Sequence, residues 1–398
     1  MKVLILSSSD CGGAGIAALR LHKALMSYGI DSSMLCFYKG TDTNQVYQVK
    51  KKLSVKILEK LPIIYRNNKY RKDVHSLLLK GTFEICSFPE AIYDISNHPL
   101  IKQADIINLH WIGNHLNYKL FFRNVRKPIV WTLHDMNPFL GISHYFGDRD
   151  SNPLFLGLEE KVRMLKNEAI SQHPNVSVVN LCQWMKEYSE KSETFANRTH
   201  TIIPNSIDTN IFRAYDKKEA RTGLNLPLDK PILLFVSQSV ENRRKGFDLL
   251  QDTLKNLHRD CVLLVVGEAT AELKSIDNSL FVGAINDERR MAMLYAAADA
   301  FILPSREDNL PNTMVESLCC GTPVISFSNG GMRDHIRTLE NGVLVEQMNS
   351  DSLLEGINLF LDNIQKFDRY GISEKAHAIF SPELQAKRYM DFFSSIKG

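Results

Sequence analysis

The sequence predicts two α/β domains, each built on a parallel β-sheet covered by helices. Its 398 residues exceed the length of a typical single domain. Short apolar segments such as PILLFVSQS and ADAFILPS alternate with longer segments of helical spacing, and this is the pattern of buried parallel strands. The pattern runs through the first half of the chain and restarts at Pro231. Nothing repeats at a short period, so the two similar halves indicate two domains rather than a solenoid.

The chain opens with a strand, a glycine-rich turn and an amphipathic helix, KVLILSSSDCGGAGIAALRLHKALMSYG. Gly12, Gly13 and Gly15 lie in the turn, but they do not have the G-x-G-x-x-G spacing of a dinucleotide site. A nicotinamide site is therefore disfavoured. Tight packing and contact with a ligand both explain glycines in such a turn.

Two further strands, ADIINLHW and KPIVWTLHD, each end in a histidine, His110 and His134. A single histidine at a strand end is most often packed or solvated. A helix at about 158–172, the strand VSVVNLCQW and another helix follow. The segment IPNSID resembles an interdomain turn, in which Pro and Asn mark the exit from the first domain, and the boundary is expected near Asn205.

In the second domain, the segment VENRRKGFDLL places Arg243, Arg244 and Lys245 just before a helix. These residues suit a diphosphate, because lysine acts as a point charge and arginine as a bidentate donor. Gly246 allows a close approach of the backbone. The alternative is that this charge run is only a solvated surface.

Residues 304–331 combine a strand end, a helix start and two carboxylates. Asn309 and Asn312 are expected to cap the helix TMVESLCC. Asp308 then lies in the preceding loop and Glu316 in the early turns, at the sheet edge where open α/β proteins bind ligands. Carboxylates accept hydrogen bonds from sugar diols, and a helix N-terminus favours phosphate. Otherwise Asp308 would be a cap and Glu316 a solvated residue.

This stretch resembles the Glu-x7-Glu signature of retaining glycosyltransferase family 4. The family has the GT-B fold, in which two Rossmann-like domains with parallel sheets face a central cleft. The resemblance implies that Glu316 binds the ribose of a nucleotide-sugar donor and that Asp308, in place of the first Glu, contacts the donor sugar. Pro311 replaces a more usual Gly, which removes one backbone donor. The version DNLPN is similar to a branch associated with surface-polysaccharide assembly.

The resemblance also assigns roles elsewhere in the chain. It implies that His134 lies beside the donor sugar, that Gly13 and Gly15 approach the donor phosphates, and that Lys245 binds the diphosphate with Arg243 or Arg244 as its partner. No metal or other cofactor is expected, because these cations and the helix dipole would replace it. The expected catalytic residues are His134, Lys245 and Asp308; the expected donor-binding residues are Gly13, Gly15, Arg243, Arg244, Lys245, Asp308, Asn309, Leu310, Asn312, Thr313 and Glu316.

The expected domains are an acceptor-side domain at 1–205 and a donor-side domain at 206–398. By the same resemblance, a last helix at about 381–396 crosses back to the first domain. Residues 50–80 carry ten Lys or Arg residues among apolar residues at helical spacing. Such a segment is either a solvated helix or one that lies on an anionic membrane surface, and a lipid-linked acceptor would favour the membrane.

Composition limits the class of protein. A net charge of +3 is small for this length and gives no case for a nucleic-acid partner. Seven scattered cysteines without metal-site spacing are expected to be reduced core thiols. The first apolar segment is too short for a signal peptide, and no segment reaches transmembrane length. We expect a cytoplasmic protein, peripheral on the inner face of the membrane if the basic segment binds there.

The family resemblance implies a metal-independent, retaining glycosyltransferase of the hexosyltransferase type. It would transfer a sugar from a nucleotide diphosphate-sugar to a glycan acceptor, expected to be lipid-linked, in capsule, exopolysaccharide or O-antigen biosynthesis. Two alternatives remain open. One is another GT-B enzyme, such as an epimerase or a phosphorylase; the other is a non-catalytic subunit that binds sugar nucleotides or acts as a membrane scaffold.

Overall fold

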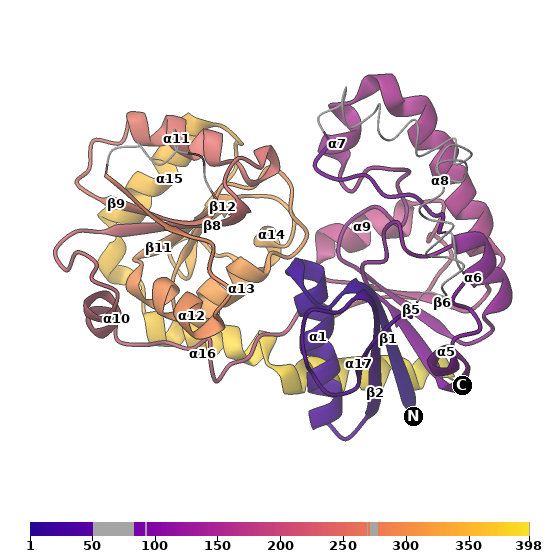
Figure 1. Cartoon of the computed structure of the whole chain (residues 1–398). Coiled ribbons are helices and arrows are strands. Elements are labelled where there is room, and N and C mark those ends of the chain that lie inside the picture. The colour runs from indigo at the N-terminus through magenta and orange to yellow at the C-terminus, as the bar shows by residue number, and fades with distance from the viewer. Residues whose placement is uncertain (51–82, 92–93, 269, 271–277, 398) are drawn as a thin grey trace. The chain divides into compact units, whose positions relative to one another are not determined.

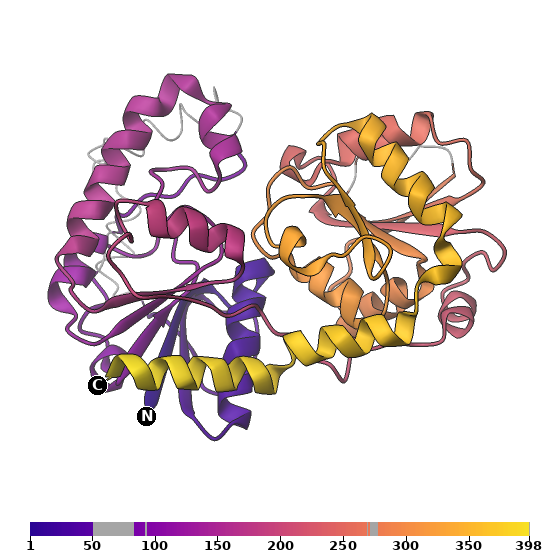
Figure 2. The same ribbon diagram turned by 180° about the vertical axis from the view of Figure 1, so that it is seen from behind.

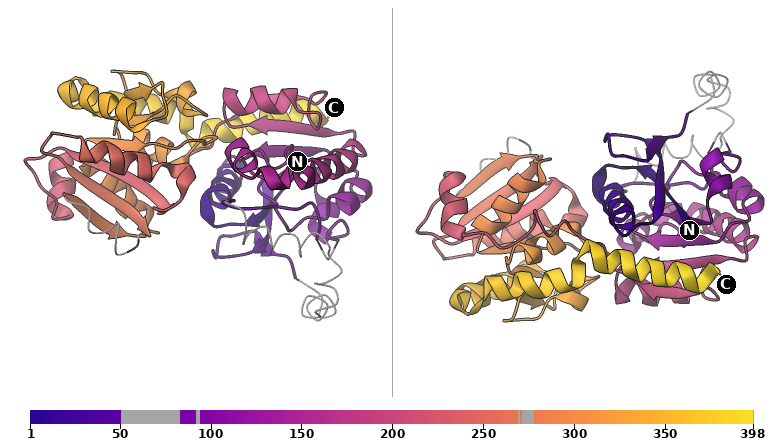
Figure 3. Two further views of the ribbon diagram at one scale, coloured as in Figure 1. Left: turned by 90° about the horizontal axis from the view of Figure 1, so that it is seen from above. Right: turned by 90° about the horizontal axis from the view of Figure 1, so that it is seen from below.

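A computed structural model describes residues 1–50, 83–91, 94–268, 270 and 278–397. The chain forms two compact units, one of Met1–Ile203 with Ala386–Gly398 and one of Pro204–Gln385 (Figure 1). Each unit has one sheet with helices on both faces (Figure 3). The predicted α/β class is therefore confirmed. The predicted basic segment at 50–80 lies outside the described residues, except for Lys50.

The first unit contains a parallel sheet with the strand order β3-β2-β1-β4-β5-β6-β7. The strand order reverses between β1 and β4. Strands β1, β4, β5 and β6 form where they were predicted, whereas β2 and β3 were not predicted. The strands are β1 (Lys2–Ser9), β2 (Asp31–Tyr38), β3 (Val46–Gln48), β4 (Ile106–Leu109), β5 (Ile129–Leu133), β6 (Val176–Asn180) and β7 (His200–Ile202). The helices are α1 (Gly12–Ser27), α5 (Pro99–Gln103), α6 (Tyr118–Asn124), α7 (Phe146–Asp150), η1 (Pro153–Phe155), α8 (Leu156–Ser171), α9 (Gln183–Lys191) and α17 (Pro382–Lys397).

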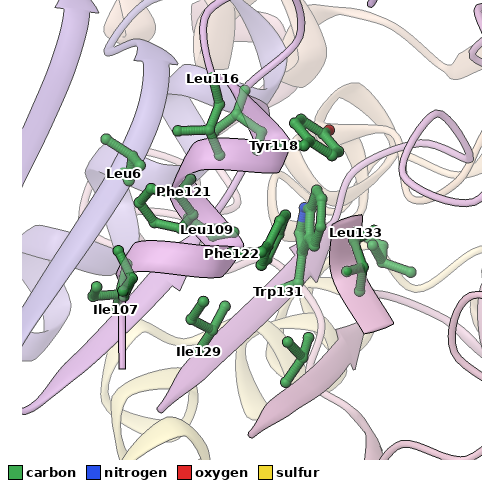
Figure 4. Packing of buried hydrophobic residues seen from close by; sticks show 14 of the residues in the cluster. Leu6, Ile107, Leu109, Leu116, Tyr118, Phe121, Phe122, Ile129, Trp131 and Leu133 are labelled. Carbon is green, nitrogen blue, oxygen red and sulfur yellow. The ribbon is translucent and has the colours of Figure 1, made fainter. Parts of the chain in front are cut away.

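Both faces of this sheet are buried because alternate side chains of each strand point to opposite sides. On β1, Val3 and Ile5 belong to a cluster with α1 and α17, while Leu4 and Leu6 belong to a cluster with α6, α8 and α9. Figure 2 shows α17 beside the strands of this unit. In the second cluster the rings of Phe122 and Trp131 are stacked with their centroids 5.8 Å apart (Figure 4). Full burial of a large apolar side chain contributes about 1.5–3 kcal/mol.

The second unit contains a parallel sheet with the strand order β10-β9-β8-β11-β12-β13. The order reverses between β8 and β11. Helices α11 and α15 cover one face, and α10, α12, α13 and α16 cover the other (Figure 1). The strands are β8 (Ile232–Ser239), β9 (Val262–Glu268), β10 (Ser279–Gly283), β11 (Ala300–Leu303), β12 (Val324–Phe327) and β13 (Gly342–Val345). The helices are α10 (Lys217–Gly223), η2 (Arg243–Lys245), α11 (Phe247–Lys255), α12 (Glu288–Ala297), α13 (Asn312–Cys319), α14 (Met332–His335), α15 (Ser350–Asp362), η4 (Ile364–Lys366) and α16 (Arg369–Phe380).

The cysteines are unpaired, and all but Cys11 are buried. The prediction of core thiols is wrong for Cys11, because this residue precedes the first turn of α1 and points away from the core. Within the described ranges, no helix combines the length and the apolar character needed to span a bilayer.

Candidate active site

The predicted donor-binding residues of the second unit lie at the carboxyl ends of β8 and β11. The basic turn η2 follows β8, and the loop that carries Asp308 follows β11. These two strands are neighbours in the sheet, at the point where the strand order reverses. This is the position at which open α/β sheets bind their ligands.

Gly246 brings the basic turn and the β11 loop together. It has a left-handed backbone with φ +72°, and a Cβ atom here would lie 1.9 Å from the carbonyl oxygen of Pro304. Only glycine fits such a contact. The sequence indicated that the backbone at Gly246 is closely approached, and the approaching group is the backbone of Pro304. This contact places Lys245 next to the loop after β11.

Asp308 is the buried anion of a three-residue charge cluster whose two cations, Lys245 and Arg244, are partly buried. Its side chain accepts a hydrogen bond from Lys245 Nζ at 2.5 Å, and Arg244 Nη1 lies 3.4 Å from the same oxygen. The residue is 7% exposed. Burial alone would raise the pKa of Asp308, but the charges of Lys245 and Arg244 and the hydrogen bond from Lys245 lower it below its usual value. Asp308 is thus ionised near neutral pH and holds both cations.

The two arginines of the basic turn, Arg243 and Arg244, differ in their hydrogen bonds and in their exposure. Arg244 Nη1 donates to the carbonyl oxygen of Glu307 at 2.9 Å, and the Arg244 carbonyl oxygen accepts from the Arg306 amide at 2.8 Å. Arg243 is exposed, and its carbonyl oxygen accepts from Arg306 Nη1 at 2.6 Å. Arg306 also forms two hydrogen bonds of 2.7 Å to the carboxylate of Asp248. The arginine beside Lys245 and Asp308 is therefore Arg244.

Helix α13 begins differently from the prediction. Its N-cap residue is Pro311, and no side chain caps the helix. The predicted caps are wrong because Asn309 is buried, with its carbonyl oxygen bound to the Gly331 amide, and because Asn312 is already in the helix and accepts a hydrogen bond from Asn205 Nδ2 at 3.0 Å. The helix nevertheless starts directly after the loop that carries Asp308, and the first N–H groups of a helix have no acceptor within the helix.

The other predicted residues of this unit lie on the same helix or just before it. Glu316 is in the second turn of α13, is partly buried, and accepts a hydrogen bond from the Tyr295 hydroxyl at 3.2 Å. Thr313 is partly buried in the first turn, and Leu310 is buried in the preceding loop. The loop and α13 thus bring Asp308, Asn309, Leu310, Asn312, Thr313 and Glu316 into one segment at the sheet edge.

In the first unit, His134 follows β5 and is paired with His110, which follows β4. His110 Nδ1 lies 2.8 Å from His134 Nε2, and His110 Nε2 lies 3.0 Å from Asn108 Oδ1. Burial lowers the pKa of His134 to about 4 and the pKa of His110 well below its usual value. Both rings are therefore neutral near pH 7. The sequence indicated the two histidines separately, but not their contact.

The two glycines predicted for the first unit have different environments. Helix α1 begins at Gly12, so Gly13 and Gly15 lie in its first turn. A Cβ atom on Gly15 would lie 2.7 Å from the carbonyl oxygen of Ser9, which explains this glycine by packing. Gly13 is exposed, and no atom lies within 4 Å of the position of its Cβ.

The loop after His134 is held by residues that the sequence did not indicate. The carboxylate of Glu159 accepts hydrogen bonds from the amides of Gly141, Ile142 and Ser143 at 2.7, 2.9 and 3.1 Å. Lys166 Nζ donates to carbonyl oxygens of the same loop. Burial lowers the pKa of Lys166 to about 7, against the opposing charges of Glu159 and Asp135. In the sequence, both charged residues resemble the solvated side of an amphipathic helix.

Asp135 connects this loop to β4. Its Oδ2 accepts a hydrogen bond from Trp111 Nε1 at 2.8 Å and lies 2.6 Å from His144 Nδ1. His144 Nε2 lies 2.8 Å from Ser87 Oγ. Burial alone would raise the pKa of Asp135, but its interactions with His144 and with the Asn137 amide lower it. The loop after His134 is thus held by hydrogen bonds among Asp135, His144 and their neighbours Trp111 and Ser87.

Residues 216–376 match the family described as "Glycosyl transferases group 1". This segment lies within the second unit and contains Lys245, Asp308 and Glu316. The second unit is thus similar to group 1 glycosyltransferases over these residues. The charge cluster at the β8 and β11 ends and the start of α13 both lie within the matching segment.

Three similar proteins extend the comparison to the whole chain. A D-inositol 3-phosphate glycosyltransferase of Xylanimonas cellulosilytica is 24% identical over 358 residues, which cover 85% of this chain and 81% of that protein. The structure of a sucrose-phosphate synthase from Thermosynechococcus elongatus covers 100% of this chain and 99% of its own, with a TM-score of 0.70 and 19% identity. The structure of the Anabaena protein HepE in complex with UDP-glucose matches 99% of this chain and 100% of its own chain, with a TM-score of 0.69 and 17% identity. The expected GT-B fold is thereby confirmed.

Proposed function

We propose that this protein is a retaining family 4 glycosyltransferase that uses a nucleotide diphosphate-sugar and needs no metal or other cofactor. The observation that carries the proposal is the cluster of Lys245, Arg244 and Asp308 beside the start of α13, at the ligand position of a group 1 glycosyltransferase domain. The similar protein crystallised with UDP-glucose supports a donor of this class.

The leaving group in such a transfer is a nucleoside diphosphate, which gains negative charge as the bond to the sugar breaks. Lys245 and Arg244 would stabilise this charge together with the first amides of α13. Both cations contact Asp308. A bound diphosphate would therefore compete with Asp308 for the two cations.

We assign substitution on one face of the sugar ring. The bond between the anomeric carbon and the phosphate oxygen breaks, and the acceptor oxygen forms the new bond on the same face. The acceptor proton passes to an oxygen of the departing diphosphate. The protein then contributes mainly orientation and charge stabilisation. In this assignment Glu316 binds the ribose, and His134 binds the donor sugar as a neutral ring.

For the acceptor, we propose a lipid-linked glycan of surface-polysaccharide assembly, and a peripheral position on the membrane. The similarity of residues 308–312 to the surface-polysaccharide branch supports the first point. The basic amphipathic composition of residues 50–80 supports the second.

The nucleotide is tested by thermal unfolding of the full chain with GDP, UDP, ADP and their common sugar conjugates. A ligand that binds only the folded protein raises the unfolding temperature. We expect a rise with one diphosphate and its conjugates that is lost in Glu316→Ala. The matched control Glu355→Ala, an exposed residue of α15, should retain the rise. Absence of a rise with every nucleotide would contradict the donor site.

The role of Lys245 is tested by release of nucleoside diphosphate from the donor in the presence of acceptor. We expect Lys245→Ala to reduce turnover by about 10²–10³-fold, since it removes one of two cations that stabilise the leaving group. The exposed Lys255→Ala on α11 is the control. Near-normal turnover in Lys245→Ala would refute this role. Donor binding by the natural protein without any release would favour a non-catalytic subunit.

A further inference from the structure

We infer that Asn108 and His110 are positioning residues that fix the tautomer of His134, so that Nδ1 of His134 is kept as a hydrogen-bond acceptor. The functional consequence rests on the proposed function, which places His134 beside the donor sugar. The tautomer itself follows from a chain of hydrogen bonds within the first unit.

This series of hydrogen bonds starts from a backbone carbonyl group, which can only accept. Asn108 Nδ2 lies 3.1 Å from the carbonyl oxygen of Val130 and 2.9 Å from Thr132 Oγ1. A carbonyl oxygen can only accept a hydrogen bond, so the amide nitrogen of Asn108 must face Val130. Its oxygen, Oδ1, must then face His110. The reversed amide would place two acceptors against each other at Val130.

The orientation of Asn108 determines the proton on His110. Asn108 Oδ1 can only accept, and it lies 3.0 Å from His110 Nε2, so Nε2 carries the proton. A neutral imidazole has one N–H group. His110 is fully enclosed, and its burial lowers its pKa, which keeps the ring neutral. His110 Nδ1 is therefore an acceptor.

The same reasoning applies to His134. His110 Nδ1 lies 2.8 Å from His134 Nε2. Because His110 Nδ1 accepts, His134 Nε2 must donate and carries the proton. In the neutral ring the other nitrogen, Nδ1, then has a lone pair. His134 can accept a hydrogen bond from a sugar hydroxyl through Nδ1, whereas the opposite tautomer would present a donor there.

The sheet holds these residues in register. Strands β4 and β5 are parallel neighbours in which Asn108 is paired with Val130. Side chains alternate along a strand, so Asn108 and His110 lie on the same side as Thr132 and His134. Thr132 Oγ1 in turn lies 2.9 Å from the Tyr389 hydroxyl of α17. The hydrogen-bond relay of Asn108, His110 and His134 thus lies on two central strands, and Thr132 connects it to α17.

The tautomer is measured directly by ¹H–¹⁵N correlation spectra of the full chain with ¹⁵N-labelled histidine at pH 7.5. The His134 signals are assigned by their loss in His134→Gln. We expect a protonated Nε2 and an unprotonated Nδ1 in the natural protein. A protonated Nδ1 would overturn the inference, and this measurement needs neither a folded relay variant nor a known substrate.

Three variants separate the relay from general packing. His110→Phe removes the acceptor and should shift His134 toward the Nδ1-protonated form. His110→Asn offers an amide oxygen in place of Nδ1 and should restore the natural form. Tyr389→Phe leaves the bond from Asn108 to Val130 in place and should not change the tautomer. An unchanged His134 tautomer in a folded His110→Phe would overturn the inference.

Measurement of kcat in the same variants tests whether the tautomer of His134 matters for catalysis. We expect kcat of His110→Phe to fall about 10-fold or more, since a wrong tautomer impairs a catalytic histidine, with the donor KM changed less and with activity recovered in His110→Asn. If the tautomer shifts while kcat stays the same, the relay stands and the placement of His134 at the donor sugar fails. The two failures are therefore distinguishable.

Discussion

Asp308 takes the place of the first Glu of the signature that residues 308–316 resemble, and its side chain is one methylene shorter. It is buried and bound to Lys245, with Arg244 beside it. The cluster contains two positive charges and one negative charge. In the proposed donor site, a diphosphate would meet cations whose charge Asp308 already partly neutralises, and the carboxylate of Asp308 would repel it.

We therefore expect Asp308→Asn to bind nucleoside diphosphate more tightly, by at least several-fold, because removal of one negative charge about 4 Å from the phosphates is worth about 1 kcal/mol even at the dielectric constant of bulk water. Titration calorimetry with the diphosphate identified by thermal unfolding would measure the change. The exposed Asp351→Asn on α15 should leave the affinity unchanged.

The same titration with the sugar conjugate separates the two roles of Asp308. If its carboxylate also contacts the donor sugar, the conjugate should gain less affinity than the diphosphate does. Weaker binding of the bare diphosphate would contradict the repulsion argument.

Among the elements, α8 has a second function besides packing on the sheet. Its Glu159 carboxylate is bonded to three successive amides of the loop after His134, and its Lys166 to carbonyl oxygens of the same loop. This loop has no regular secondary structure of its own over residues 134–145. Two buried side chains of one helix, Glu159 and Lys166, thus replace the hydrogen bonds that a strand or helix would have supplied.

We expect Glu159→Gln to lower the free energy of unfolding of the first unit by about 1–3 kcal/mol, because a neutral amide cannot satisfy three buried N–H donors. Hydrogen exchange should accelerate at Gly141, Ile142 and Ser143. The neighbouring Glu160→Gln, an exposed partner of Arg163, should change stability by only about 0.5 kcal/mol. Unchanged protection of the three amides in Glu159→Gln would argue against this role of α8.

The sequence predicted most strands of both sheets because buried parallel strands form continuous apolar runs. Through the family resemblance, it also assigned Lys245 and Asp308 to one donor site, and the structure shows the two side chains in contact. It could not predict the cap of α13, since Pro311 is followed by an asparagine that is already helical. Nor could it predict Glu159 and Lys166, because helical spacing does not show that a loop folds over the charged side. The contact between His110 and His134 depends on strand register, which no local pattern encodes.

For the whole molecule, buried histidines make stability depend on pH. Burial lowers the pKa of His134, His173 and His335 to about 4. The unfolded chain takes up these protons near pH 6.5, whereas the folded chain does so only near pH 4. The free energy of unfolding should therefore fall as the pH is lowered from about 7 toward 4.

Urea unfolding at pH 7.5, 6 and 5 would measure this dependence in both units. We expect a loss on the order of 1–2 kcal/mol for each of these histidines between pH 7.5 and pH 5. The exposed His258→Gln should not change the slope. A stability that stays constant over this range would show that the histidines titrate alike in the folded and unfolded chains.

The last residues of the chain, from Ala386 onward, complete the core of the unit that the first residues begin. Ala386, Tyr389 and Phe393 are fully buried with α1 and with alternate residues of β1 and β5. During synthesis on the ribosome, the first unit therefore emerges with one face of its sheet partly uncovered. This apolar face stays partly uncovered until the second unit has been translated, so the first unit cannot complete its core before the second unit has been synthesised.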